Sequence, residues 1–178
     1  MKYYLNALIL LISSSIIYAC ASQPLPPPQW QYEKEAIKLH IKADPKLNLE
    51  EGTPHTLYVC VYQLKDPNAF NQLAGDNDGI YKLLECALFD SAVATSKKLI
   101  VHPGQDMNFV LDRADGAKYL SVVAGYFTLQ KDRMIRLFNI PVVVEEKGFF
   151  KRKKIQKPGR LDIELILGPQ QIETVGGK

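Results

Sequence analysis

The chain has 178 residues, with 22 Lys and Arg against 19 Asp and Glu, which gives a formal net charge of +3 at pH 7. A charge so near neutral argues against nucleic acid as a partner. The length suits one domain that can bury a sizeable core.

The first 19 residues predict a lipoprotein signal peptide. Lys2 precedes an uncharged, apolar run from Tyr3 to Ile17. This run has the length of a signal-peptide core and is too short for a bilayer-spanning helix. Ile17-Tyr18-Ala19 then leads into Cys20, a pattern similar to the bacterial lipobox except for the bulky Tyr18. We expect lipid on Cys20; the alternative is a plain signal peptide with a chance cysteine.

The segment 20–29 predicts a tether, because Pro24 and Pro26 to Pro28 favour an extended backbone. At about 3.1 Å per residue, such a segment would hold the domain at 30–178 on the order of 25 Å from the lipid. By resemblance to other bacterial lipoproteins, Ala21 after the cysteine favours the outer membrane. We therefore expect a lipid-anchored domain on the periplasmic face of the outer membrane.

Three segments then alternate between strand and loop patterns. Residues 33–43 place Ile37, Leu39 and Ile41 on one face and polar side chains on the other, which predicts a half-buried strand. Residues 45–55 carry Pro, Asn and Gly and predict a loop. Residues 56–64, "TLYVCVYQL", predict a second strand.

A helical spacing of apolar residues follows over about residues 67–90. Phe70 and Leu73 predict one short helix, and the apolar residues from Ile80 to Leu88 predict another. Asp78, directly before a glycine, is the expected N-cap of the second helix.

Strand patterns return in the second half of the chain, at 97–102, 107–112, 118–127, 132–140 and 160–167. About seven short strands with one helical insertion predict a mainly β protein, an antiparallel β-sandwich. Cys60 and Cys86 remain after the signal peptide, in a compartment where disulfides persist. We expect them to form a disulfide; the alternative is two independent buried thiols.

Several of these segments together resemble a known family. They are the lipobox and proline-rich tether, "VYQLKDPNAF", "FDSAV", "VHPGQD" and "DRADGAKYLSVVAGYF". In this order they are similar to the TssJ (SciN) family of outer-membrane lipoproteins of type VI secretion systems, over about Ile37 to Leu167. The resemblance implies a transthyretin-like β-sandwich that docks the periplasmic C-terminal region of the inner-membrane protein TssM.

In that family docking is attributed to the loop between the first two strands, which here runs from Asp44 to His55. The resemblance therefore implies a partner-binding role for the polar and apolar side chains of this loop: Asp44, Lys46, Leu47, Asn48, Leu49, Glu50 and Glu51. The alternative is a solvated connector whose leucines fold back onto the rim of the sandwich.

A basic stretch at 151–160 holds six cationic side chains, beginning with Lys151, Arg152, Lys153 and Lys154. It predicts a contact with anionic lipid headgroups or with an acidic partner. The alternative is a solvated hairpin tip, since a loop between two strands needs polar residues in any case.

Other functions find weaker support in the sequence. A glycan-binding sandwich would need exposed aromatic residues, for which Tyr58, Tyr62 and Tyr126 are candidates. The three histidines have no metal-ligand spacing, and no Gly-x-Ser-x-Gly motif is present. We therefore expect no metal, no cofactor and no enzymatic activity.

Overall fold

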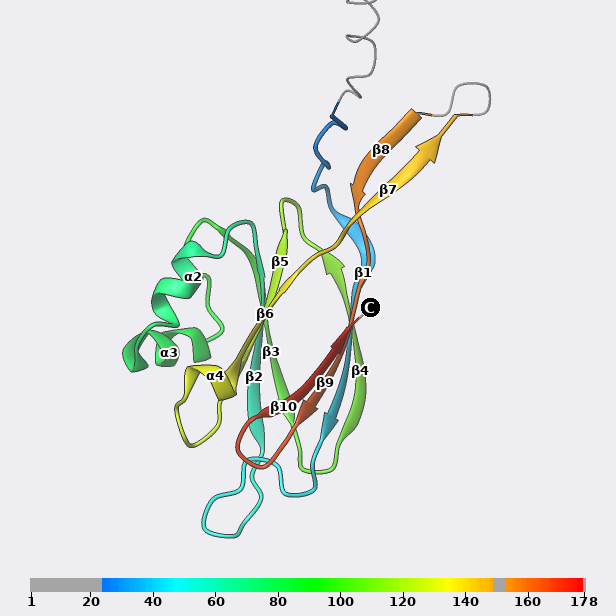
Figure 1. Ribbon diagram of the computed structural model, residues 1–178. Helices are drawn as coiled ribbons and strands as arrows, with labels where there is room; N and C mark the ends of the chain where they lie inside the picture. The colour runs from blue at the N-terminus through cyan, green and yellow to red at the C-terminus, as the bar shows by residue number, and fades with distance from the viewer. Residues whose placement is uncertain (1–23, 149–152, 178) are drawn as a thin grey trace, which may run out of the picture.

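The computed structural model describes residues 24–148 and 153–177, which form two packed β-sheets, a short helical insertion and a protruding hairpin (Figure 1). The predictions for the signal peptide at 1–19 and for Cys20, Lys151 and Arg152 lie outside the described residues.

The first sheet has the strand order β10-β9-β1-β4. Its strands are β1 (Glu33–Ala43), β4 (Asp106–Arg113), β9 (Leu161–Leu167) and β10 (Ile172–Gly177). The β1 and β9 strands run parallel, whereas the other pairs are antiparallel. Both strands start at the end of the sandwich that carries the hairpin, so they run in the same direction (Figure 1).

The second sheet has the order β3-β2-β5-β6, and all of its pairs are antiparallel. Its strands are β2 (Leu57–Leu64), β3 (Val93–Val101), β5 (Tyr119–Ala124) and β6 (Ile135–Asn139). A single helical turn, α4 (Lys131–Met134), leads into β6.

The core lies between the inner faces of the two sheets. The register pairs Leu39 of β1 with Phe109 of β4 on one side and with Ile163 of β9 on the other, so apolar side chains line up across the first sheet. In the second sheet Val61 of β2 lies opposite Val122 of β5. The alternation of apolar and polar residues that predicts strands is thus what builds this core.

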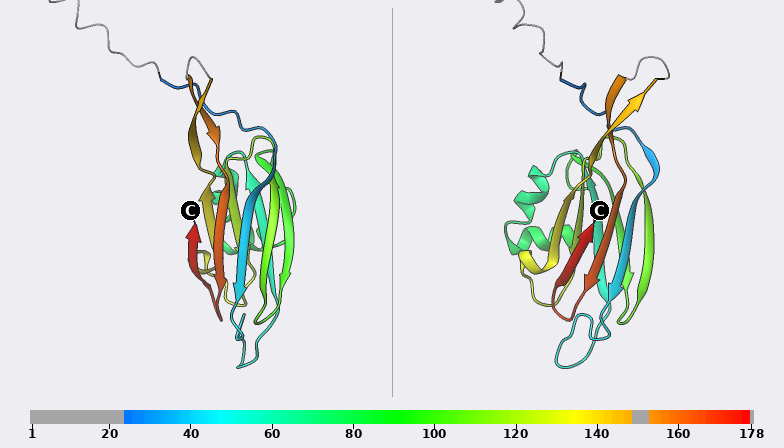
Figure 2. Two further views of the ribbon diagram at one scale, coloured as in Figure 1. Left: turned by 90° about the vertical axis from the view of Figure 1, so that its right-hand side faces the viewer. Right: turned by 45° about the vertical axis from the view of Figure 1, so that its right-hand side comes forward.

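The helical insertion covers the outer face of the second sheet (Figure 2). It consists of α2 (Asn68–Leu73) and α3 (Asn77–Leu84). The ring of Tyr62 on β2 packs edge-to-face against Phe70 and Phe89, and its hydroxyl donates to the carbonyl oxygen of Leu83 at 2.6 Å. This cover explains why β2 is buried on both faces.

A disulfide also ties the insertion to the sheet. The structure joins Cys60 on β2 to Cys86 just beyond α3, with 5.3 Å between their Cα atoms. The bond closes a loop of 26 residues, which in the chain-entropy account stabilises the fold by about 3.5 kcal/mol.

The prediction for the cap of α3 is wrong. Asp76 is the N-cap, and its side chain accepts from the backbone N–H of Gly79 at 2.7 Å. Asp78 lies within the first turn. α3 therefore begins at Asn77, two residues earlier than predicted. Gly79 packs so closely on the end of α2 that a Cβ there would lie 1.9 Å from the carbonyl oxygen of Leu73.

A two-stranded hairpin, β7 (Val142–Lys147) and β8 (Lys153–Pro158), projects from the end of the sandwich at which the tether enters (Figures 1 and 2).

The predicted fold class, a mainly β sandwich with a short helical insertion, is confirmed. The sequence patterns missed β7, β8, β10, α4 and the parallel pairing of β1 with β9. Within the described residues, no helix is long and apolar enough to cross a bilayer.

Candidate docking loop and tether end

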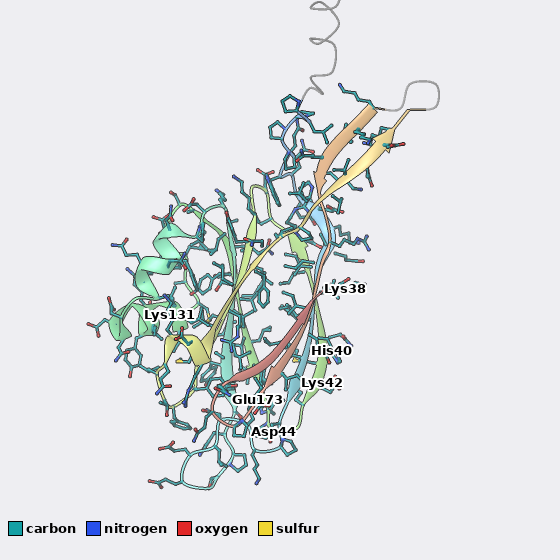
Figure 3. All side chains as sticks on the ribbon, viewed as in Figure 1. Lys38, His40, Lys42, Asp44, Lys131 and Glu173 are labelled. Atoms are coloured by element: carbon teal, nitrogen blue, oxygen red, sulfur yellow. A yellow bond between two sulfur atoms is a disulfide. The ribbon has the colours of Figure 1, made fainter. Side chains whose placement is uncertain are left out.

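The loop between β1 and β2 lies at the end of the sandwich opposite the hairpin and tether (Figures 1 and 2). It begins at Asp44, which Figure 3 shows at the lower end of β1. The Asp44 carboxylate accepts from the backbone N–H of Lys46 at 2.6 Å, and its carbonyl oxygen accepts from Leu47 at 2.9 Å. The chain therefore turns sharply as soon as the strand ends.

The tip of the loop is a small hairpin. The N–H of Glu50 donates to the carbonyl oxygen of Thr53 at 3.0 Å, and the reverse bond measures 2.8 Å. Between them Glu51 and Gly52 both have positive φ, +48° and +79°. This is the geometry of a two-residue type I′ turn, whose twist matches that of paired strands. The tip is thus a defined structure.

Leu47 anchors the loop in the core. The sequence offered it as an apolar contact for a partner, but its side chain is fully buried and belongs to the hydrophobic core. That expectation is corrected for Leu47, because a leucine with no exposed surface cannot touch a partner. Leu49 is half-buried, and its N–H donates to Pro169 ahead of β10 at 2.8 Å.

Asn48 is a second anchor, with only 5% of its surface exposed. Its φ of +48° is one that asparagine tolerates better than most residues. The side-chain oxygen accepts from the N–H of Phe127 at 3.1 Å, and the side-chain nitrogen donates to the carbonyl oxygen of Thr56 at 3.4 Å. Asn48 therefore joins the loop to the segment after β5.

The side chains that the loop presents to solvent are polar or small: Pro45, Lys46, Glu50, Glu51, Gly52, Thr53 and Pro54. The tip itself carries two carboxylates. A rigid, exposed and acidic tip suits recognition of a basic surface.

An apolar surface lies beside this loop. Phe127 is 55% exposed, and its ring stacks edge-on against His55 with centroids 5.1 Å apart. On the neighbouring face Tyr58 and Ile100 are opposite each other on β2 and β3, and both are about half exposed. The ammonium group of Lys98 sits 4.5 Å from the Tyr58 ring centroid. Aromatic groups of this kind are enriched at protein interfaces.

At the opposite end Arg113 holds three segments together, although only 3% of its surface is exposed. Its guanidinium pairs with Glu33 at the start of β1 at 3.0 Å and donates to the carbonyl oxygen of Gln31, between the tether and β1, at 3.0 Å. It also donates to the carbonyl oxygen of Gly159 at the base of the hairpin at 3.4 Å. Its charge is typical of a surface residue, yet Arg113 continues the inward-facing series of alternate residues in β4, which is the signal in the sequence for its burial.

A second anchor fixes the base of the tether. The Tyr32 hydroxyl donates to the Asp112 carboxylate at 2.5 Å, and the backbone N–H of Glu35 donates to the same carboxylate at 2.8 Å. These hydrogen bonds, the one from Tyr32 first, hold the pKa of Asp112 below its usual value. The Glu35 backbone has φ of +53°, so Asp112 stabilises an irregular start of β1.

The structure separates the three aromatic candidates for glycan binding. Tyr62 and Tyr126 are buried, and burial raises the pKa of both hydroxyls, that of Tyr62 to about 12. The Tyr126 hydroxyl donates to Gln171 at 2.8 Å. Tyr58 alone of the three is exposed, and Lys98 covers its ring.

An open groove of about 630 Å³ lies on the outer face of the first sheet. Figure 3 shows Lys38, His40 and Lys42 along this face, and the latter two pair with Asp106 and Glu164. The groove lining contains no tyrosine, tryptophan or phenylalanine on which a sugar ring would stack. Among residues 24–148 and 153–177, no cluster of His, Cys, Asp or Glu has the arrangement of a metal site.

Comparison with known families identifies the chain. A family model described as "Type VI secretion lipoprotein, VasD, EvfM, TssJ, VC_A0113" matches residues 35–165. The chain belongs to this type VI secretion lipoprotein family. The resemblance found in the sequence is thereby confirmed. No curated protein sequence matches the chain significantly.

Solved structures share the fold at low sequence identity. TssJ1, a T6SS lipoprotein from Pseudomonas aeruginosa, is 18% identical with a TM-score of 0.58 over 85% of this chain and 98% of that one. Lip from Serratia marcescens, a membrane-bound component of the type VI secretion system, is 18% identical with a TM-score of 0.56 over 80% and 96%. A structure described as the T6SS protein TssM C-terminal domain (869–1107) from EAEC is 19% identical with a TM-score of 0.54 over 79% and 96%.

Proposed function

We propose that this protein anchors a type VI secretion membrane complex to the outer membrane. Lipid on Cys20 holds the tether end at the periplasmic face of that membrane. The β1–β2 loop, at the far end of the sandwich, docks the periplasmic C-terminal region of an inner-membrane TssM-like protein. The protein acts through binding and not through catalysis.

One observation carries the proposal: the loop is a fixed, exposed hairpin at the end opposite the tether (Figure 2). A chain anchored at one end would present this loop to the periplasm. Because Leu47 and Asn48 already hold the backbone, binding would order little additional chain. Family membership and the fold shared with a structure described as a TssM C-terminal domain support the choice of partner.

The geometry also refines which loop residues would make contact. Glu50, Glu51 and Lys46 are exposed and available to a partner, together with Asp44, which is half-buried at the base of the loop. Leu47 and Asn48 are buried and hold the backbone of the loop in place. We expect the docking surface to continue from the tip onto Phe127, which Asn48 holds through the backbone N–H.

The test is a binding titration of residues 23–178 against the periplasmic region of the TssM-like protein from the same cell. Reversing both tip charges, Glu50→Lys with Glu51→Lys, should weaken binding at least tenfold, because the charges lie at the centre of the surface. The matched control, Asp115→Lys with Asp162→Lys, reverses two exposed charges elsewhere and should change affinity less than twofold. Equal affinity of the tip variant and the wild type would contradict the loop assignment.

A further inference from the structure

The β7–β8 hairpin lies at the same end of the molecule as the described part of the tether, which begins at Pro24 in the sequence (Figures 1 and 2), and Lys147 lines one groove with Pro26 and Pro27. Cys20 precedes Pro24 by four residues, which span at most about 14 Å when fully extended. The sandwich stands off from the lipid by the length of the tether, but the hairpin runs back beside the tether. A lipid on Cys20 therefore holds the free end of the hairpin close to the bilayer.

The hairpin has a fixed position beside the tether. Arg113 donates to Gln31, between the tether and β1, and to Gly159 at the hairpin base, so one buried side chain joins both segments. The N–H of Gly159 donates to Pro141 at 2.7 Å and closes the base. The base of the hairpin is therefore fixed relative to the segment that leads from the tether into β1.

The charge of the hairpin is uneven along its length. Near the middle Glu145 pairs with Lys157, and Glu146 lies opposite Lys154. At the free end Lys147 lies directly opposite Lys153. Like charges in this arrangement destabilise a strand pair, and an anionic surface against the end of the hairpin removes that cost.

The hairpin also exposes apolar surface. Val142 and Val144 lie on one face of β7, and their side chains are 44% and 55% exposed. An isolated two-stranded hairpin is marginally stable in water. The register places Lys154 on the face of Val142 and Val144, and places Lys147 and Lys153 on the opposite face with Val143, which is 38% exposed. Both faces thus combine apolar side chains with cations, which suits the boundary between headgroups and acyl chains.

We infer that the β7–β8 hairpin rests on the membrane surface and that Lys147, Lys153 and Lys154 bind anionic phospholipid headgroups beside the lipid anchor. The inference rests on the lipidation of Cys20 in the proposed function. It assigns to the hairpin a second, electrostatic attachment, which fixes the orientation of a domain that a lipid alone would leave free to tilt. Each lysine near an anionic surface strengthens such a contact by about fivefold.

The test is lysine acetylation of the mature lipidated protein in vesicles, read residue by residue by mass spectrometry. Vesicles of phosphatidylcholine alone are compared with vesicles that also contain phosphatidylglycerol. In the mixed vesicles Lys147, Lys153 and Lys154 should react at least fivefold more slowly, and high salt should restore their rates. Lys46 in the β1–β2 loop and Lys82 on α3 should react equally in both.

Two variants sharpen the test. In Lys153→Gln with Lys154→Gln, the protection of Lys147 should be lost, whereas the matched Lys82→Gln with Lys131→Gln should keep it. Equal hairpin rates in both vesicle types, with the protein retained on both, would overturn the hairpin contact and leave the anchor standing. Loss of the protein from neutral vesicles would overturn the anchor and the inference together. If the lysines are protected only when the TssM-like region is added, and not by anionic lipid, the membrane contact would be overturned in favour of an acidic protein partner.

Discussion

The two ends of the sandwich are built in different ways. The β1–β2 loop is held from below by Leu47 and Asn48, whose side chains belong to the buried interior. The β7–β8 hairpin stands clear of the core, and a single buried cation, Arg113, attaches its base. The loop tip is acidic, whereas the free end of the hairpin is basic. The two ends of the domain therefore differ in what fixes them. Packing against the core shapes the loop end, and charge shapes the hairpin end.

The largest expected effect comes from Leu47→Asp. It places a carboxylate where no solvent reaches, so the free energy of unfolding should fall by about 4 kcal/mol. Urea denaturation measures this loss. Thr53→Asp, at the exposed tip, is the control and should change stability by less than about 0.5 kcal/mol. A similar small loss in both variants would mean that the core does not shape the loop.

Arg113→Met should destabilise the hairpin end of the sandwich. It removes a largely buried cation from Glu33, Gln31 and Gly159, and we expect a loss of about 3 kcal/mol. Amide hydrogen exchange should accelerate in the hairpin and in β1 near its start, and remain slow in the β1–β2 loop. Arg160→Met, at a neighbouring exposed arginine, is the control. Faster exchange in the β1–β2 loop would contradict the independence of the two ends.

Tyr62 belongs to neither end of the sandwich, because it is buried under the helical insertion. Its ionisation therefore tests the stability of the core between the two ends. Burial raises the pKa of its hydroxyl to about 12, above the ordinary value of 10.0. The protonated hydroxyl therefore stabilises the fold fully below pH 10, and this contribution is lost as the pH rises from 10 to 12.

We expect the stability advantage of the wild type over Tyr62→Phe to shrink by about 2 kcal/mol over that interval, as measured by urea denaturation at each pH. Tyr81→Phe, at an exposed tyrosine of α3, is the control and should show no such change. A constant difference between wild type and Tyr62→Phe would mean that Tyr62 ionises as an exposed phenol does.

The smallest effect is expected from Asn48. Asn48→Ala removes the bond to Phe127 and keeps a strained positive φ, so about 1.5 kcal/mol should be lost. Asn48→Gly removes the same bond but relaxes the backbone, and it should lose about 1 kcal/mol less. Thermal denaturation separates the two variants. Equal losses would show that the backbone conformation contributes nothing.

Local periodicity predicted much of this fold. The alternation in residues 33–43 and 160–167 gave two core strands correctly, and the helical spacing after Pro67 gave both helices of the insertion. These features depend on neighbours two to four residues apart. The parallel pairing of β1 with β9 depends on contacts more than 120 residues apart along the chain, for which one sequence holds no local signal.

The candidate site was predicted less completely for the same reason. The loop was predicted from its Pro, Asn and Gly, and its docking role from a family resemblance. Its composition did not show that Leu47 points inward while Glu50 and Glu51 point outward. That distinction arises from the turn at Asp44 and from the bond between Asn48 and Phe127. Arg113 looks like a surface cation in the sequence, because its three partners lie far away along the chain.

Site-specific photo-crosslinking in whole cells would show which end of the sandwich meets the TssM-like protein. A benzophenone amino acid is placed at Thr53 on the loop tip or at Val144 on the hairpin, and the adducts are identified by mass spectrometry. We expect an adduct between the Thr53 variant and the TssM-like inner-membrane protein, and none with that protein from the Val144 variant. An adduct with the TssM-like protein from Val144 and none from Thr53 would show that the molecule faces the other way.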